Sequence, residues 1–234
     1  MTVISGLREF VWQQNARLPE EGLVSLTWGN VSGRLDDLIA IKPSGVPYAE
    51  MEPDDMVVLD LEGNKVAGEL RPSIDTTTHL EIYRAFPSVG GVVHAHSTYG
   101  TAFAQARSPI PCLGTTHADH FNGPVPVTRP LTEGEVGDEY EANTGRVIVE
   151  HFRTQAIDPL HVPAVLAAGH APFVWGTDAS NAVDNAVALE ASARMALLTG
   201  ILTGSDPIPL EEWVLAKHHE RKHGASAYYG QEER

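Results

Sequence analysis

The sequence is poor in three features, and each absence narrows the range of functions. It contains one cysteine, Cys112, so no disulfide can form within the chain, which agrees with a reducing compartment. Its 16 Lys and Arg stand against 31 Asp and Glu, a formal net charge of −15, which argues against a nucleic-acid-binding surface. A phosphorylated metabolite is still compatible with this net charge as a substrate, because a local pocket can be cationic on an acidic protein.

Long apolar runs are the third missing feature. No segment approaches the run of roughly 18 uncharged residues that spans a membrane, although 42% of the residues are apolar and can form a core. Residues 1–22 carry polar and charged groups where a signal peptide has its apolar centre. We therefore expect a cytoplasmic protein with no membrane partner, and the length of 234 residues predicts one domain over 1–234.

Hydrophobic periodicity predicts alternating helices and short strands. Helices are expected over 3–18, 76–86, 98–107, 143–154, 179–202 and 210–224, and a long loop region over 108–140. Strands are expected over 23–32, 38–46, 90–97, 164–171 and 172–176, with a hairpin over 56–69. Several strands are joined by turns too short for a crossover, which predicts an α/β fold with a central, largely antiparallel sheet flanked by helices.

The segment "GGVVHAHS" carries two histidines, His94 and His96, that share one face of a predicted strand. Buried imidazoles need partners, so one explanation is a metal ion held by both rings. The other explanation is two core histidines bonded to backbone carbonyls. For a His-x-His pair at the end of a valine strand, the metal is favoured.

A third ligand is needed, and His170, at the end of another apolar segment, is the best candidate. His117 and His120 lie in a Thr-rich loop and are less rigidly placed. Three neutral imidazoles leave a coordination position open, which is typical of a catalytic metal site. Asp75 could add a carboxylate or could cap the helix that follows it, and the two roles are compatible.

Three loops resemble anion-binding cradles: "TWGNVS", "IKPSGV" and "RPSID". In the second, Lys42, Ser44 and Gly45 bring together an ammonium group, a hydroxyl and accessible backbone N–H groups. In the third, Ser73 precedes a helix N-terminus, itself an anion site. Each loop alone is more often an ordinary turn, but three of them beside a metal site favour a phosphorylated substrate.

These segments also resemble a known family. "LTWGNVS", "IKPSGV", "FPSVGGVVHAHS", "GTTHADHF", "TGRVIVEHF" and "KHHERKHGASAYYGQ" are similar to the L-ribulose-5-phosphate 4-epimerases of the class II aldolase family, and the resemblance runs from about residue 5 to residue 231. It implies a largely antiparallel sheet flanked by helices, and a homotetramer whose active sites lie at subunit interfaces.

The resemblance also implies roles for particular residues. Zinc ligands are expected at His94, His96 and His170, with Asp75 as a further ligand or near-ligand. Phosphate and substrate contacts are expected at Asn30, Lys42, Ser44, Gly45, Ser73, Thr115, Glu141 and His218. Asp119 and Tyr229 are expected as the acid/base pair, the tyrosine coming from a neighbouring subunit. Cobalt or manganese could replace zinc, because imidazole ligands suit several metals.

The implied activity is inversion at C4 of L-ribulose 5-phosphate to give D-xylulose 5-phosphate, by cleavage and re-formation of a C–C bond. Two departures from the family pattern bear on the substrate: Ile74 replaces a serine of the phosphate loop, and His120 follows the expected catalytic Asp119.

Three other hypotheses remain open at this stage. An aldolase that releases its two fragments would use the same metal and phosphate sites. A non-catalytic, adducin-like assembly module would keep the fold and lose the ligands, whereas all three histidines are present here. A cupin-type iron dioxygenase also uses His-x-His, but the long predicted helices do not suit a small all-β barrel.

Overall fold

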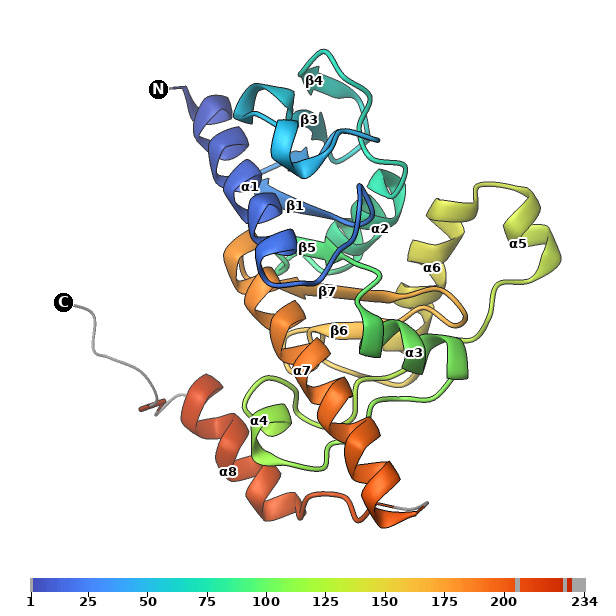
Figure 1. Ribbon diagram of the computed structural model, residues 1–234. Helices are drawn as coiled ribbons and strands as arrows, with labels where there is room; N and C mark the ends of the chain where they lie inside the picture. Colours follow the sequence, from blue (N-terminus) through green and yellow to red (C-terminus); the bar gives the residue numbers. More distant parts are fainter. Residues whose placement is uncertain (1, 205–206, 225–226, 229–234) are drawn as a thin grey trace.

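A seven-stranded sheet of order β4-β3-β2-β1-β5-β7-β6 forms the centre of the protein (Figure 1). The computed structural model describes residues 2–204, 207–224, 227 and 228. The strands are β1 Asn30–Leu35, β2 Leu38–Ile41, β3 Val57–Asp60, β4 Lys65–Ala67, β5 Gly91–His94, β6 Ala164–Leu166 and β7 Pro172–Gly176. All pairings between these strands are antiparallel, which confirms the predicted fold class.

Eight α-helices and two short 3-10 turns accompany the sheet in the described part of the chain. They are α1 Val3–Glu20, η1 Tyr48–Glu50, η2 Pro53–Asp55, α2 Thr76–Ala85, α3 Thr98–Ala106, α4 Thr115–Ala118, α5 Glu133–Gly137, α6 Tyr140–Thr154, α7 Ala179–Thr203 and α8 Glu212–His223. The two longest helices start at side-chain caps. Thr2 accepts the N–H of Ser5, and Asp178 accepts the N–H of Asn181, which satisfies donors that the helix itself leaves unpaired.

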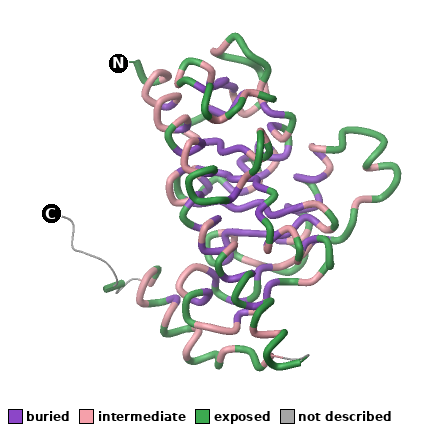
Figure 2. The backbone as a smooth tube through the Cα atoms, in the orientation of Figure 1, coloured by how far each residue is buried: buried purple, intermediate pink, exposed green. Residues whose placement is uncertain are grey.

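Helices cover both faces of the sheet, and the buried residues gather between the layers (Figure 2). On one face α1 and α7 pack over Val31, Val93 and Val174. On the other face α2 and α6 pack over Val92 and Trp175. Val92 and Val93 of β5 thus point to opposite layers, as the period of two requires. Because both faces of β5 are buried, the strand reads as a continuous apolar run.

Gly91 shows why glycine begins β5. A Cβ atom at Gly91 would lie 2.4 Å from the backbone nitrogen and Cα of Ala179, the first residue of α7. Only a residue without a side chain allows the helix to start this close to the sheet. This contact fixes α7 against β5, the strand that carries the first two histidines toward the site.

Helix α7 is long and apolar enough, by length and composition alone, to cross a membrane. Its N-terminal half packs against β5 and β7, and ten of its residues are buried, so core packing accounts for much of this hydrophobicity. Its C-terminal half instead exposes Leu198, Ile201 and Leu202.

The structure corrects several predicted boundaries. The strand expected over 23–32 begins only at Asn30, because Leu26 and Gly29 have positive φ and form a turn. The strand expected over 164–171 ends at Leu166, where residues 167–171 make a tight turn closed by the Ala167 N–H donating to the Ala171 carbonyl. The region 108–140 was predicted to be loop, but it contains α4 and α5, and α6 starts at Tyr140 rather than near 143.

Candidate metal centre

A cavity of about 600 Å³ opens at the end of the sheet where β1 begins and where β2 and β5 end. Its walls come from five separate segments of sequence and from the N-terminus of α6. The lining residues include Trp28, Asn30, Lys42, Ser44, Gly45, Ser73, Ile74, Asp75, His94, His96, Tyr140, Glu141 and His170. The three predicted metal ligands and the predicted anion loops therefore face one space.

His94 is the last residue of β5 and is held on two sides. Its ring stacks on Phe173 of β7 at a centroid distance of 4.1 Å and an interplanar angle of 14°. Its Nδ1 lies 2.9 Å from the carbonyl oxygen of Pro172. Because a carbonyl can only accept, Nδ1 carries the proton, and Nε2 is the nitrogen left with a free lone pair.

His96 and His170 complete a close group with His94. The candidate ligand atoms of the three residues all lie within 4.8 Å of one another, and their ring centroids are 4.9 to 5.0 Å apart. His96 lies two residues beyond the strand end, whereas His170 comes from the turn between β6 and β7. The turn is tight because Gly169 adopts a φ of +74°, which glycine tolerates without strain.

The electrostatics of this group favour a neutral imidazole at His96 and at His170. Burial, with the neighbouring His94 and His96, lowers the pKa of His170 to about 4. Burial and His94 also lower the pKa of His96. A metal ion needs deprotonated nitrogens, so the three side chains fit a divalent ion that prefers nitrogen ligands. His170 Nδ1 is buried and has no hydrogen-bond partner among the described residues, which leaves one donor or acceptor unsatisfied at this centre.

Asp75 lies beside the histidines rather than within their close group. Its carboxylate accepts a hydrogen bond of 2.7 Å from the Asn30 side-chain amide, and its charge is felt by His94 and His170. Burial opposes ionisation of Asp75, but the surrounding histidines and the Asn30 amide outweigh it and hold the pKa below the usual value. Asp75 occupies the N-cap position of α2 without accepting a helix N–H, so the predicted cap bond is not formed.

Asn30 and Ser73 form the polar floor of the anion loops. The Asn30 amide nitrogen donates to Ser73 Oγ at 3.0 Å and to Asp75, which uses both of its protons. The N–H groups of Ser44 and Ser73 are also engaged, donating to the carbonyls of Arg71 and Lys42. The Asn30 side chain thus orients Ser73 and Asp75, and its expected contact with phosphate stays a prediction.

Lys42 is a buried cation in the cavity wall. Its Nζ donates to the Val46 carbonyl at 2.9 Å and to the Pro43 carbonyl at 3.3 Å. Burial lowers the pKa of Lys42 to about 8, since the charged form is poorly solvated there. The ammonium group is therefore mostly charged at neutral pH and gives an acidic protein a local positive charge beside the metal candidate.

A second polar cluster lies apart from this cavity and contains three of the predicted site residues. Asp119, at the end of α4, accepts two hydrogen bonds from Arg221 of α8, of 3.0 and 2.7 Å, and one of 3.0 Å from His218. Thr115 begins α4. Asp119, Thr115 and His218 are absent from the cavity wall. Tyr229, the other predicted acid/base residue, lies outside the described residues.

Burial of Asp119 opposes its ionisation, but the bonds from Arg221 and His218 prevail and hold its pKa below the usual range. The neighbouring His120, a departure from the family pattern, is bonded to Asn185 and Lys222 rather than to Asp119.

Two cavity residues were missed by the sequence reasoning. Tyr140, the first residue of α6, lines the cavity beside Glu141, and its ring centroid lies 6.3 Å from that of His170. Trp28 lines the opposite wall, 6.5 Å from His96. Helix α6 was predicted to start near residue 143, so Tyr140 fell in the predicted loop. The one signal in the sequence that Tyr140 faces the site was its position next to Glu141, a predicted site residue.

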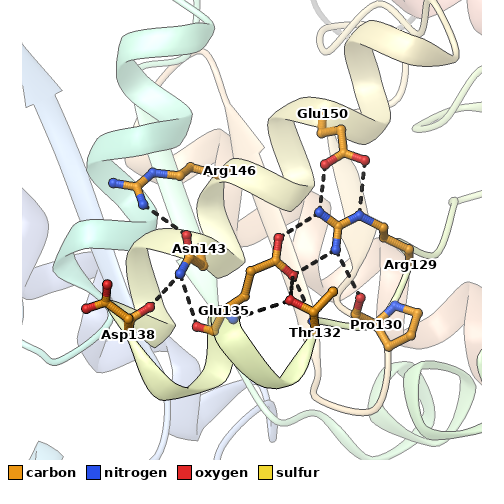
Figure 3. A network of polar contacts seen from close by, with 8 residues as sticks. All are labelled: Arg129, Pro130, Thr132, Glu135, Asp138, Asn143, Arg146 and Glu150. Atoms are coloured by element: carbon orange, nitrogen blue, oxygen red, sulfur yellow. Dashed lines mark hydrogen bonds and ion pairs between the residues drawn. The ribbon is translucent and has the colours of Figure 1, made fainter.

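A polar network holds the start of α6 at the cavity (Figure 3). Arg129 bonds the carboxylates of both Glu135 and Glu150, and Asn143 bonds the carbonyls of Glu135 and Asp138. Hydrogen bonds from Arg129 and from Thr132 lower the pKa of Glu135 to about 2. The network joins α5 to α6. The exposed segment over residues 129–139 therefore holds Tyr140 and Glu141, which follow it, at the cavity.

The histidine group predicts a defined loss of metal. Replacing His96 or His170 by Ala should abolish stoichiometric metal binding while the protein still folds, because neither side chain is fully buried. Elemental analysis of purified protein and circular dichroism measure the two properties. His151→Ala on α6 is the matched control and should keep its metal. Full occupancy in His96→Ala or His170→Ala would remove that residue from the ligand set.

Lys42 predicts a pH-dependent affinity for anions. Its ammonium loses charge as the pH rises through about 8, while inorganic phosphate is dianionic from about pH 8 upward. The dissociation constant of inorganic phosphate should therefore increase between about pH 8 and about pH 10. Lys42→Met should weaken binding about tenfold or more at neutral pH and flatten this dependence. Lys65→Met, an exposed lysine on β4, is the control, and an identical pH profile in Lys42→Met would place the phosphate elsewhere.

Comparisons with known proteins agree with this geometry. Residues 11–197 match the sequence model of the class II aldolase and adducin N-terminal domain. The chain is 53% identical over 228 residues to L-ribulose-5-phosphate 4-epimerase UlaF of Salmonella paratyphi A, covering 96% of this chain and 98% of that protein.

Two solved structures are also similar. An L-fuculose 1-phosphate aldolase superimposes with a TM-score of 0.77 and 27% identity, over 92% of this chain and 95% of the other. YgbL of Klebsiella pneumoniae, described as a putative aldolase/epimerase/decarboxylase, has a TM-score of 0.74 and 25% identity, over 94% and 100% of the two chains. The chain therefore belongs to the class II aldolase and adducin N-terminal domain family.

Proposed function

We propose that this protein is an isomerase, a zinc-dependent L-ribulose-5-phosphate 4-epimerase. The observation that carries the proposal is one cavity in which three imidazoles face the loop bearing Lys42, Ser44 and Gly45 and the loop bearing Ser73. This combination suits a substrate with a metal-chelating end and a phosphate end. The 53% identity to a curated epimerase over nearly the full length of both chains supports this choice of substrate.

The chemistry explains why such a cavity is needed. In a 2-ketopentose 5-phosphate, C4 is not adjacent to the carbonyl, so its proton is not acidic and direct deprotonation is a poor route to inversion. When the C4 hydroxyl loses its proton and the C3–C4 bond breaks, the products are glycolaldehyde phosphate and the enediolate of dihydroxyacetone, which takes the electron pair of the broken bond. When bound, the metal supplies Lewis-acid stabilisation of negative charge. The loops around Lys42 and Ser44 hold the phosphorylated aldehyde so that it can turn its other face and react again.

Zinc is proposed because three histidines with an open position match its catalytic sites. Cobalt and manganese accept the same donors, so the metal is chosen by affinity and supply as well as by geometry. Asp75 is proposed as a further or outer ligand, since its carboxylate would offset the positive charge of the ion.

Asp119 and Tyr229 are proposed as the acid/base pair, with Thr115, Glu141 and His218 shaping the site. Inversion needs a proton acceptor and a proton donor on the two faces of the aldehyde carbon. The contacts with Arg221 and His218 keep Asp119 ionised at neutral pH, as an acceptor must be. Those same contacts also reduce its basicity.

The separation of Asp119 from the cavity supports a shared site in a homotetramer. Within one chain its cluster is formed by α4 and α8, away from the histidines. Exposed apolar residues lie at the C-terminal end of α7 and the start of α8: Ile201 is 68% exposed, Leu202 86% and Trp213 75%. Exposed apolar groups of this kind are typical of protein interfaces. We propose that α7 and α8 meet a neighbouring subunit there and bring Asp119 to its metal cavity.

Three further assignments belong to the same proposal. Residues 1–234 form one domain, with a single sheet running through the described part. The protein is proposed to be cytoplasmic, with a buried free cysteine, Cys112, as a reducing compartment allows. We propose a phosphorylated ketopentose as its substrate, and we propose neither nucleic acid nor a membrane as a binding partner.

An aldolase is the second candidate, favoured by the solved L-fuculose 1-phosphate aldolase of the same fold. It would use the same cavity and release both fragments. The three-histidine group disfavours the adducin-like assembly module, which needs no ligands at this position.

The activity can be measured directly. Incubation of metal-loaded protein with L-ribulose 5-phosphate should give D-xylulose 5-phosphate in the NMR spectrum, with no accumulation of dihydroxyacetone. The phosphate-binding loops should retain the aldehyde fragment until the bond re-forms. Accumulation of dihydroxyacetone would support the aldolase instead, and an unchanged spectrum would refute both activities.

The shared site predicts complementation between two inactive variants. Asp119→Asn should keep its metal and lose about 10²–10⁴ in kcat, because the amide cannot accept a proton. His96→Ala should lose the metal. Mixing the two under conditions of subunit exchange should restore activity, since some interfaces then combine an intact His96 with an intact Asp119.

The mixture of His96→Ala with His170→Ala is the matched control. Both changes fall on the same cavity, so every site in mixed tetramers carries one of the two defects and activity should stay absent. Failure of the first mixture to recover activity, despite demonstrated exchange, would show that the two clusters do not form one site across an interface.

A further inference from the structure

Tyr48 joins two of the loops that form the cavity, although it is absent from the cavity wall itself. It begins η1, directly after the loop that holds Lys42, Ser44 and Gly45. Its hydroxyl lies 2.9 Å from the Gly29 carbonyl oxygen and 3.0 Å from that of Trp28, and it donates its proton there. Burial raises the pKa of Tyr48, so the phenol remains a donor throughout the physiological range.

The Tyr48 ring also contacts the cation of the same loop. Lys42 Nζ lies over this ring, 4.9 Å from its centroid, while it donates to the Val46 and Pro43 carbonyls. An aromatic face attracts an ammonium group, and the attraction is stronger where water is excluded. The ring and the two carbonyls therefore hold the ammonium in one place, although its flexible stem permits many others.

The other end of the contact reaches the metal-bearing strand. Gly29 adopts a φ of +80°, and a Cβ atom there would lie 2.8 Å from the His94 carbonyl oxygen and 3.3 Å from Ala95 Cα. The backbone at Gly29 is thus pressed against the segment that presents His94 and His96. A hydrogen bond from Tyr48 to this backbone links the anion loop to the histidine group by a chain of direct contacts.

We propose that Tyr48 is a positioning residue, which sets the Lys42 ammonium and its loop at a fixed separation from the three-histidine group. A ligand with a chelating end and a phosphate end must reach both at once, so this separation determines how well the phosphate fits. The inference rests on the proposed function for its ligand class. Tyr48 acts through Lys42 and Gly29 and does not itself touch the substrate.

The test separates phosphate binding from metal chelation. Tyr48→Phe keeps the ring under Lys42 and removes only the hydroxyl. In metal-loaded protein it should raise the KM for L-ribulose 5-phosphate and the dissociation constant of inorganic phosphate about threefold to tenfold, as loss of one hydrogen bond implies. The kcat should change less than about twofold, since the reacting end is untouched. Inhibition by glycolohydroxamate, a chelator without phosphate, should be unchanged.

A second variant and a control sharpen the result. Tyr48→Leu also removes the aromatic face and should weaken phosphate binding further than Tyr48→Phe does. Tyr99→Phe is the matched control: the Tyr99 ring also carries a cation, Arg194 at 5.7 Å, but it lines a different groove. It should leave the KM, the kcat, the dissociation constant of phosphate and the inhibition by glycolohydroxamate at their wild-type values.

The outcomes distinguish this role from the proposed function. Unchanged phosphate affinity in Tyr48→Phe, or equal weakening of phosphate and glycolohydroxamate, would overturn the positioning role and leave only a contribution to folding. If the wild-type protein binds phosphate but does not convert L-ribulose 5-phosphate, a selective loss in Tyr48→Phe would uphold positioning while the proposed substrate fails. A wild-type protein that binds no phosphate would overturn both.

Discussion

The register of β5 against its two neighbours is the constraint on which the site depends. In this register His94 lies opposite Asn30 of β1 on one side and opposite Phe173 of β7 on the other. Phe173 and Pro172 then fix the His94 ring and its proton, and Asn30 orients Asp75. A shift of one residue would turn His94 to the opposite face, because side chains alternate along a strand. The contact of Gly91 with the start of α7 opposes that shift, because a Cβ atom at this place would lie 2.4 Å from the backbone of Ala179.

Charge is arranged locally against the overall composition. The chain is strongly acidic, yet its cavity combines the buried Lys42 ammonium with neutral imidazoles. Neutral histidines cost little to bury and can still accept a cation, whereas buried charges need partners. Lys42 finds carbonyls and an aromatic ring, and Asp75 finds an amide. One space can thus accommodate a metal ion and an anion, two groups of opposite charge.

Much of the fold followed from local pattern, and the errors have local physical causes. The helices over 3–18 and 179–202 were placed correctly because a 3.6-residue period and caps act within the chain itself. The strand expected over 23–32 failed because the backbone turns at Leu26 and Gly29 before pairing begins. The short helices α4 and α5 were missed because few residues carry too little periodicity to detect.

For the site, sequence alone indicated the metal candidates, because His-x-His at a strand end and a further histidine at the end of another apolar segment are unusual among apolar residues. It also indicated the loop around Lys42. Only the tertiary structure decided which groups meet. The tertiary structure brings the three histidines together and pairs Asp119 with Arg221. It also directs the Asn30 amide to Ser73 and Asp75, places Tyr140 in the cavity wall and packs Tyr48 against Lys42. Such contacts join residues distant in sequence, and their distances depend on packing that no local pattern encodes.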